Sequence, residues 1–159
     1  MPVQIGSQLP YPEFRRNYLT RRRSPIIWPG DALAKELDQA EHNEYGRLTL
    51  SAPDGGLEVL PGTSMTLQVV RPGDATTPHE HAWWHLYFVR SGAGTAVFDE
   101  PDGPVRVGDG DILFIPAWVA HHLENDAESG QDLILLNMSN LPQQSELNNL
   151  RSKEGIKRC

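Results

Sequence analysis

Histidines are the residues of this sequence whose type and spacing point most directly to chemistry. The chain of 159 residues contains six, and five of them fall within positions 79–122. In an extended strand alternate side chains share a face, so His79, His81 and His85 would point the same way. Imidazole is a good ligand for first-row transition metals. Three imidazoles on one strand face therefore predict a site for one divalent transition metal ion.

A second segment, residues 110–125, contributes the adjacent pair His121 and His122. Neighbouring residues of a strand point to opposite faces, so only one of this pair can join the first three histidines. The sequence thus predicts a cluster of up to four imidazoles drawn from two separate segments.

The elements that must position these histidines read as β-structure from residue 46 to residue 140. Apolar and β-branched runs alternate with turn clusters rich in Gly, Pro and Asp, and about nine such runs predict an all-β sandwich or barrel. The expected strands are 47–50, 57–60, 65–71, 81–90, 94–99, 105–107, 111–115, 121–125 and 132–138. In the histidine-bearing strand the alternate face is apolar too, so we expect a second sheet or another subunit to cover it.

The flanking segments differ in composition from this β-rich body. Residues 1–45 form an N-terminal arm with one short helix expected over residues 31–41, where Leu33 and Leu37 are four apart. We expect residues 46–140 to be the barrel and residues 141–159 to be a polar C-terminal tail. The arm carries a basic cluster, for which a solvated arm or a subunit contact is favoured over an anionic partner. Its members are Arg15, Arg16, Arg21, Arg22 and Arg23.

Composition excludes several classes of protein. The formal net charge is −7, which argues against nucleic acid as a partner. No apolar run approaches the roughly 20 residues needed to cross a bilayer. The first residues lack the pattern of a signal peptide, and the one cysteine, Cys159, cannot close an internal disulfide. We therefore expect a cytoplasmic protein with no membrane contact.

The spacing of the first histidine segment resembles the first motif of the cupin superfamily. Gly73, His79, His81, His85 and Gly92 stand at the anchor positions of that motif, with histidine at position 85 where the family usually has glutamate. The resemblance implies a double-stranded β-helix, the jelly-roll barrel of cupins. Some small cupins are similar in placing histidine at this position and binding the metal with four imidazoles.

The second segment resembles the second cupin motif in the same way. Gly110, Pro116, His121 and Asn125 match its anchors, and Trp118 replaces the usual glycine. Carried over from the family, His79, His81 and His121 are the three metal-binding histidines, and His85 occupies the fourth ligand position. His122 is then expected to be a solvent-side or structural residue.

Histidine in place of glutamate changes what the metal would do. Four neutral imidazoles leave a divalent ion its full charge, so the site should attract anionic oxygen donors such as catecholates, enolates or carboxylates. Four protein ligands on a six-coordinate ion leave two open positions, too few for a chelating substrate and O2 together. If His85 stays outside the ligand set, a third position opens and His85 could act as an acid–base residue.

Neighbouring side chains predict the kind of substrate. Trp83, Tyr87 and Trp118 fall on or near the inward side, which suits a planar or apolar ligand. Gln68 and Arg71, on the preceding strand, are candidates for binding a substrate oxygen or carboxylate.

The stretch of residues 104–125 resembles gentisate and related hydroxy-aromatic ring-cleaving dioxygenases. That resemblance implies a mononuclear dioxygenase acting on a hydroxylated aromatic or related anionic small molecule. Fe(II) or Mn(II) is the favoured metal, and Zn, Ni, Co or Cu is possible.

Three other interpretations stay open. An O2-independent metal cyclase, isomerase or lyase needs only two open positions. The chain could instead be a non-catalytic cupin subunit that docks on a larger dioxygenase through the arm at residues 11–23 and the face of Trp84, Leu86 and Phe88. A homodimer explains the same features and is favoured. A sugar-nucleotide epimerase is the weakest alternative, because those cupin relatives usually lack the full histidine set.

Overall fold

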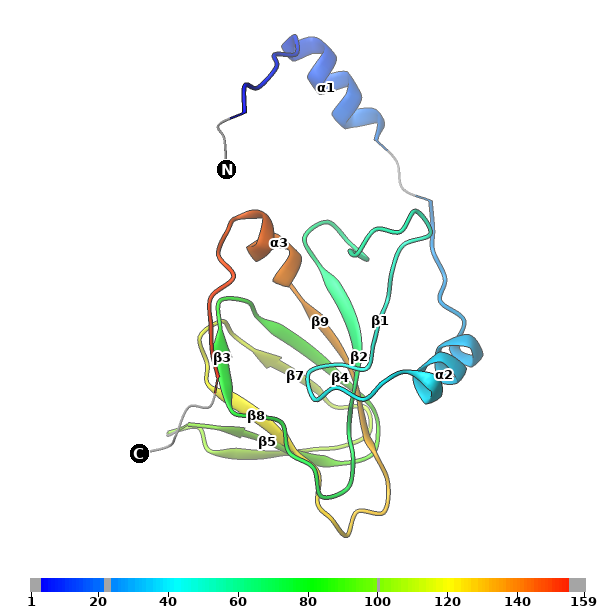
Figure 1. Cartoon of the computed structure of the whole chain (residues 1–159), viewed down its shortest axis with the longest axis vertical. Coiled ribbons are helices and arrows are strands. Elements are labelled where there is room, and N and C mark those ends of the chain that lie inside the picture. Colours follow the sequence, from blue (N-terminus) through cyan, green and yellow to red (C-terminus); the bar gives the residue numbers. More distant parts are fainter. Residues whose placement is uncertain (1–3, 22–23, 100, 155–159) are drawn as a thin grey trace.

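The computed structural model describes residues 4–21, 24–99 and 101–154, and its body is two antiparallel β-sheets (Figure 1). The first sheet has the order β1 (Leu48–Thr49), β2 (Ser64–Val70), β9 (Leu133–Ser139), β4 (His85–Ser91) and β7 (Ile112–Ile115). The second has the order β10 (Ser152–Glu154), β3 (His79–His81), β8 (His121–Glu124), β5 (Gly94–Phe98) and β6 (Pro104–Val107). The predicted all-β class is confirmed.

The sheets enclose one apolar core to which strands of both contribute. Burial of a side chain the size of valine or leucine stabilises the fold by roughly 1.5–3 kcal/mol through removal of apolar surface from water. The members are Val70, Tyr87, Val89, Ala96, Val107, Ile115, Leu123, Leu133 and Leu135. This core fills one end of the barrel and leaves the other end for polar side chains.

The predicted long strand that carries three histidines is wrong in one respect. The chain leaves the second sheet after β3 and enters the first sheet at β4, with residues 82–84 as the connection. The backbone N–H of Trp84 donates to Asn140 Oδ1 (2.9 Å), which fixes this crossing. Because His81 and His85 are an even number of residues apart, the two-residue repeat of side-chain faces carries through the connection, and periodicity alone could not reveal it. The histidines therefore converge from two sheets and not from one strand face.

Two other segments differ from the predicted strands and tail. Residues 57–60 contain no strand, only an isolated bridge from Leu60 to Thr63. After α3 (Leu141–Glu146), the polar C-terminal segment forms β10, which pairs with β3. All three residues of β10 are exposed, so this edge strand has no apolar alternation that the sequence could have shown.

The N-terminal segment contains two helices. The predicted helix is present as α2 (Gly30–Gln39), and its Leu37 packs with Leu67 and Val69 on the outside of the first sheet. The basic segment forms a second helix, α1 (Tyr11–Thr20), which stands away from the sheets and buries none of its residues (Figure 1). Arg22, Arg23 and Cys159 lie outside the described residues.

Within the part of the chain that the structure describes, the outer face of β4 is not covered. Phe88 is 43% exposed, and Ile112 and Phe114 of the neighbouring β7 are 70% and 57% exposed. The expected cover by a second sheet is therefore wrong for this face, because the second sheet packs on the inner side. Among the described residues no helix is long and apolar enough to cross a membrane. The cytoplasmic location stays a prediction.

Candidate metal centre

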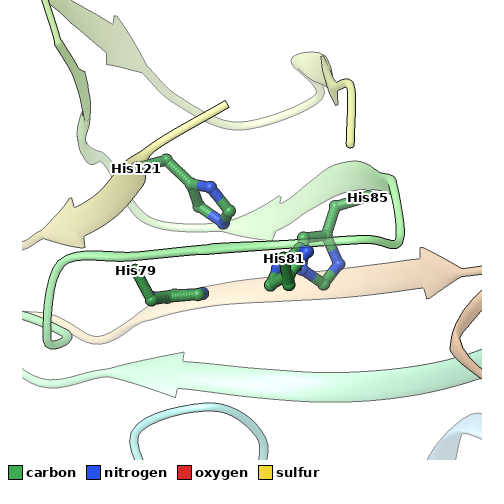
Figure 2. A group of neighbouring side chains, drawn as sticks. All are labelled: His79, His81, His85 and His121. Atoms are coloured by element: carbon green, nitrogen blue, oxygen red, sulfur yellow. The ribbon is translucent and has the colours of Figure 1, made fainter. Parts of the chain in front are cut away.

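Four buried imidazoles meet between the two sheets (Figure 2). His79 and His81 come from β3, His121 from the adjacent β8, and His85 from β4 of the opposite sheet. One ring nitrogen from each lies within 4.8 Å of the other three. In the ladder His79 pairs directly with His121. The structure thus brings together all four histidines that the sequence singled out for metal binding.

Backbone carbonyls hold three of the rings in one tautomer. A carbonyl oxygen only accepts, so each Nδ1 that contacts one must carry the proton, which leaves the Nε2 lone pair free. This carbonyl–imidazole arrangement is the usual way in which proteins orient histidine ligands. The pairs are His79 with Thr77 (2.7 Å), His81 with Trp83 (2.7 Å) and His121 with Val119 (2.8 Å).

His85 is oriented by a side chain. Its Nδ1 donates to Asn137 Oδ1 of β9 (2.8 Å), so its Nε2 also presents a lone pair. That Nε2 lies 2.9 Å from the Nε2 of His81. Two facing lone pairs repel one another unless a cation lies between them.

The donor set fits a transition metal ion. Metal–imidazole bonds of about 2.0–2.1 Å place neighbouring ligand nitrogens about 3 Å apart, close to the His81–His85 separation. The Nε2 of His121 is buried and has no hydrogen-bond partner, as expected of an atom whose lone pair is free to bind a metal. Neutral imidazole is also the form that binds a metal.

Burial keeps these rings neutral. It lowers the pKa of His81 to about 4, partly offset by the Trp83 carbonyl. It lowers the pKa of His85 to about 2, with the neighbouring His81 and His121 as further causes. The pKa of His121 falls to about 3, again chiefly through burial. At neutral pH these three ligand atoms need no deprotonation before they bind a metal.

Aromatic rings surround the cluster on the cavity side. The indole of Trp83 stacks on the His81 ring with centroids 4.1 Å apart and an interplanar angle of 7°. Tyr45 meets His79 edge-on at 5.1 Å, and Tyr87 lies 5.1 Å from His85. Sequence reasoning missed Tyr45, because it comes from an irregular segment before β1 that carries no motif.

A cavity of about 830 Å³ opens onto the histidines. It is lined by three of them, His79, His81 and His85, and its remaining lining is contributed largely by β2, β9 and α3. The predicted substrate-binding residues Gln68, Trp83 and Tyr87 also line it. Asn137 lines it as well, although the sequence gave no spacing signal for this residue.

Two predicted substrate-binding residues lie elsewhere. Arg71 is exposed just beyond the end of β2 and does not line the cavity. Trp118 is 46% exposed and does not line it either. Its φ of 63° is the left-handed conformation that the glycine of the motif adopts easily, and this backbone turns the indole outward. The backbone N–H of Trp118 donates to the backbone carbonyl of His81 (2.8 Å), so the backbone of Trp118 helps to position the histidine cluster.

His122 takes a separate position. It is buried, and its Nε2 pairs with Glu124 Oε1 at 2.8 Å rather than facing the other four rings. The alternation along β8 explains this, because adjacent side chains of a strand point to opposite faces.

Comparisons with known proteins agree with this geometry. A family model described as a cupin domain matches residues 66–137. A curated 5-aminosalicylate 1,2-dioxygenase of Comamonas sp is 37% identical over 71 residues, which are 44% of this chain and 18% of that protein.

Solved structures of salicylate 1,2-dioxygenase variants from Pseudoaminobacter salicylatoxidans share the fold. One has a TM-score of 0.68 at 18% identity and covers 82% of this chain and 40% of its own. Another, in complex with gentisate, has a TM-score of 0.69 at 18% identity, and the match covers 82% of this chain and 37% of that one. This chain therefore spans less than half the length of these relatives, and identities this low show the fold alone. With two antiparallel sheets, both histidine motifs and the domain match in agreement, the chain has the cupin fold, and its residues 66–137 match a cupin domain.

Proposed function

We propose that this chain is a metal-dependent cupin dioxygenase that acts on a hydroxylated aromatic or related anionic small molecule. The observation that carries the proposal is the convergence of four buried imidazoles at a cavity lined by aromatic rings. The names of the matched relatives support it, since they are dioxygenases of 5-aminosalicylate and salicylate.

His79, His81 and His121 would hold one divalent ion, with Fe(II) or Mn(II) favoured, and His85 would either complete the ligand set or stand beside it as an acid–base residue. When bound, such an ion supplies Lewis acidity toward oxygen donors and redox chemistry with O2. The ligands bring no negative charge, so the ion would be a local positive centre within an acidic chain.

The chain's own residues orient the ligands and shape the substrate space. Carbonyls two residues away hold three rings, and Asn137 holds the fourth. Trp83 and Tyr87 present aromatic surface to a planar substrate. Tyr87 is buried, and burial raises the pKa of its hydroxyl, so it stays protonated and can only act as a neutral donor or acceptor.

One observation favours a second candidate function. The short His81–His85 separation supports a ligand role for His85, which would leave two open positions on a six-coordinate ion. Two positions suffice for an O2-independent cyclase, isomerase or lyase acting on an enolisable substrate.

Oxygen consumption separates the two candidates. We expect the Fe(II)-loaded chain, given catechols and hydroxybenzoates in turn, to consume one O2 per substrate converted. The measurement is an oxygen electrode read beside product analysis, with the His121→Ala variant as the inactive control. Conversion without O2 uptake would support the cyclase class instead. Conversion only after addition of a larger catalytic chain would support the subunit alternative.

We also infer that the chain forms a homodimer through its outer apolar face, defined as Trp84, Leu86, Phe88, Ile112 and Phe114. These side chains are contiguous across β4 and β7, where Leu86 pairs with Phe114 and Phe88 with Ile112. The N-terminal segment is a suitable complement. Residues 1–23 contain five arginines and one glutamate, so their formal net charge is +4. The formal net charge of residues 24–159 is then −11. Helix α1 also presents unburied aromatic rings.

The dimer is tested by one charge placed on that face. Phe114→Asp should shift the chain from dimer to monomer at micromolar concentration, because a carboxylate cannot be buried there without a partner. Val105→Asp is the matched control: Val105 is 43% exposed, against 57% for Phe114, but it lies on the other sheet, and its substitution should leave the dimer intact. Sedimentation of all three proteins measures this. A monomeric wild type would contradict the homodimer.

A further inference from the structure

The charged residues around the cavity are all of one sign. Its described lining contains Glu58, Glu146 and Glu154 and no lysine or arginine. Glu154 lies opposite His79 in the pairing of β10 with β3, so one of these carboxylates is next to the histidine cluster. No cation forms an ion pair with any of the three within the part of the chain that the structure describes. The cavity therefore lacks the arginine or lysine that usually holds a carboxylate substituent of a substrate.

A buried acceptor lines the same cavity. Gln68 is 2% exposed, and its Nε2 donates to the backbone carbonyl of Glu44 at 2.6 Å. That bond fixes the orientation of the amide and commits its donor group. The other amide atom, Oε1, is buried with no hydrogen-bond partner. A buried acceptor without a partner costs about 1–3 kcal/mol, which a donor group in the cavity would recover.

The neighbouring residues of β2 show where this acceptor lies. Side chains on one face of a strand recur every second residue, so Ser64, Thr66 and Gln68 line the cavity in sequence. Ser64 and Ser139 pair at the level of His85, and Thr66 and Asn137 pair at the next level inward. Gln68 lies one level deeper still, beyond His85 when seen from α3.

We propose that this cavity selects a hydroxylated aromatic whose substituent remote from the metal is a hydrogen-bond donor, neutral or cationic, and that Gln68 Oε1 receives that donor. The proposal rests on the proposed function, because the anionic oxygens of the substrate are assigned to the metal end. A carboxylate at the remote end would meet an acceptor, in a cavity whose charged lining residues are all carboxylates. A hydroxyl or protonated amino group would meet a partner and an attractive field.

The test compares three probes that share one metal-binding end: catechol, its 4-carboxylate and its 4-aminoethyl derivative. Calorimetry on the zinc-substituted protein measures their affinities without turnover, since zinc has no redox chemistry. We expect the aminoethyl derivative to bind at least about tenfold more tightly than the carboxylate, the change that one charge-assisted hydrogen bond produces.

Two variants assign the preference to residues. Gln68→Leu should weaken binding of the aminoethyl derivative far more than binding of plain catechol, so that the affinities of the two probes become similar. Glu146→Lys changes an exposed residue and does not threaten the fold; it should narrow the aminoethyl-to-carboxylate ratio. Glu128→Lys makes the same charge change on an exposed residue outside the cavity and should leave the ratio unchanged.

The outcomes distinguish failure of the donor preference from failure of the proposed dioxygenase function. If the carboxylate binds as tightly as the aminoethyl derivative or more tightly, the donor preference is wrong and the dioxygenase proposal stands. If Gln68→Leu weakens all three probes equally, Gln68 supports the fold and does not receive the donor. If no probe binds the zinc-loaded protein, both proposals fall.

Discussion

Replacing His121 by alanine is expected to strip the chain of its metal ion and of the proposed dioxygenase activity. The Nε2 of this residue is buried without a hydrogen-bond partner and lies within 4.8 Å of the other three ligand nitrogens. Changes to residues that merely orient a ligand cost about 10–100-fold in metal affinity, so loss of the ligand itself should cost at least about 100-fold. Metal content after dialysis, together with O2 uptake, measures both losses.

The chain offers a matched control in the next residue. His122 is also buried on β8, yet it faces away from the cluster and pairs with Glu124. His122→Ala removes the same side chain from the same strand and should retain full metal content. Equal loss of metal in the two variants would indicate a damaged strand and not a lost ligand.

The second large effect is expected at His85, the residue that departs from the family pattern. Its Nε2 lies 2.9 Å from that of His81, and Asn137 holds its ring in place. We therefore expect His85→Ala to lower metal affinity by about 100-fold or more, as for a direct ligand. Anaerobic titration with Fe(II) or Mn(II) against a competing chelator measures this.

Substitution of His85 by glutamate, the usual residue at this position of the family, further tests whether His85 is a direct metal ligand. His85→Glu restores a carboxylate at the fourth position, so it should bind the metal while cancelling part of its positive charge. Anionic catechols should then bind the metal-loaded variant more weakly than wild type. If His85→Ala instead binds metal as tightly as wild type, His85 is not a ligand, and the role of a neighbouring acid–base residue becomes the better account.

The spacing of the motifs predicted the metal cluster well because it reports on turns as well as on strands. His79, His81, His85 and His121 were all selected from sequence, and all four meet in the structure. The single strand expected to carry three of them was wrong, since the change of sheet at residues 82–84 preserves the alternation of side chains. Because this connection keeps the even spacing of the histidines, their side chains were expected to point toward one another, and they do, although the assumed strand arrangement was wrong.

The substrate cavity was less predictable, because distant and irregular segments form it. Tyr45 precedes β1 in a loop, and Glu154 belongs to an edge strand with no apolar pattern. Trp118 occupies a glycine position of the motif, where a left-handed backbone decides the direction of the side chain. Aromatic residue type alone placed it near the substrate, whereas the backbone turns it outward.

The measurement that tests the central claim most directly is the metal content of the full chain purified without chelator. Four converging imidazole lone pairs predict close to one equivalent of a first-row transition metal per chain, bound tightly enough to survive dialysis. Elemental analysis by mass spectrometry gives the number and the identity of the metal together. A chain that holds no stoichiometric metal, and takes up none when Fe(II), Mn(II) or Zn(II) is supplied anaerobically, would contradict the account.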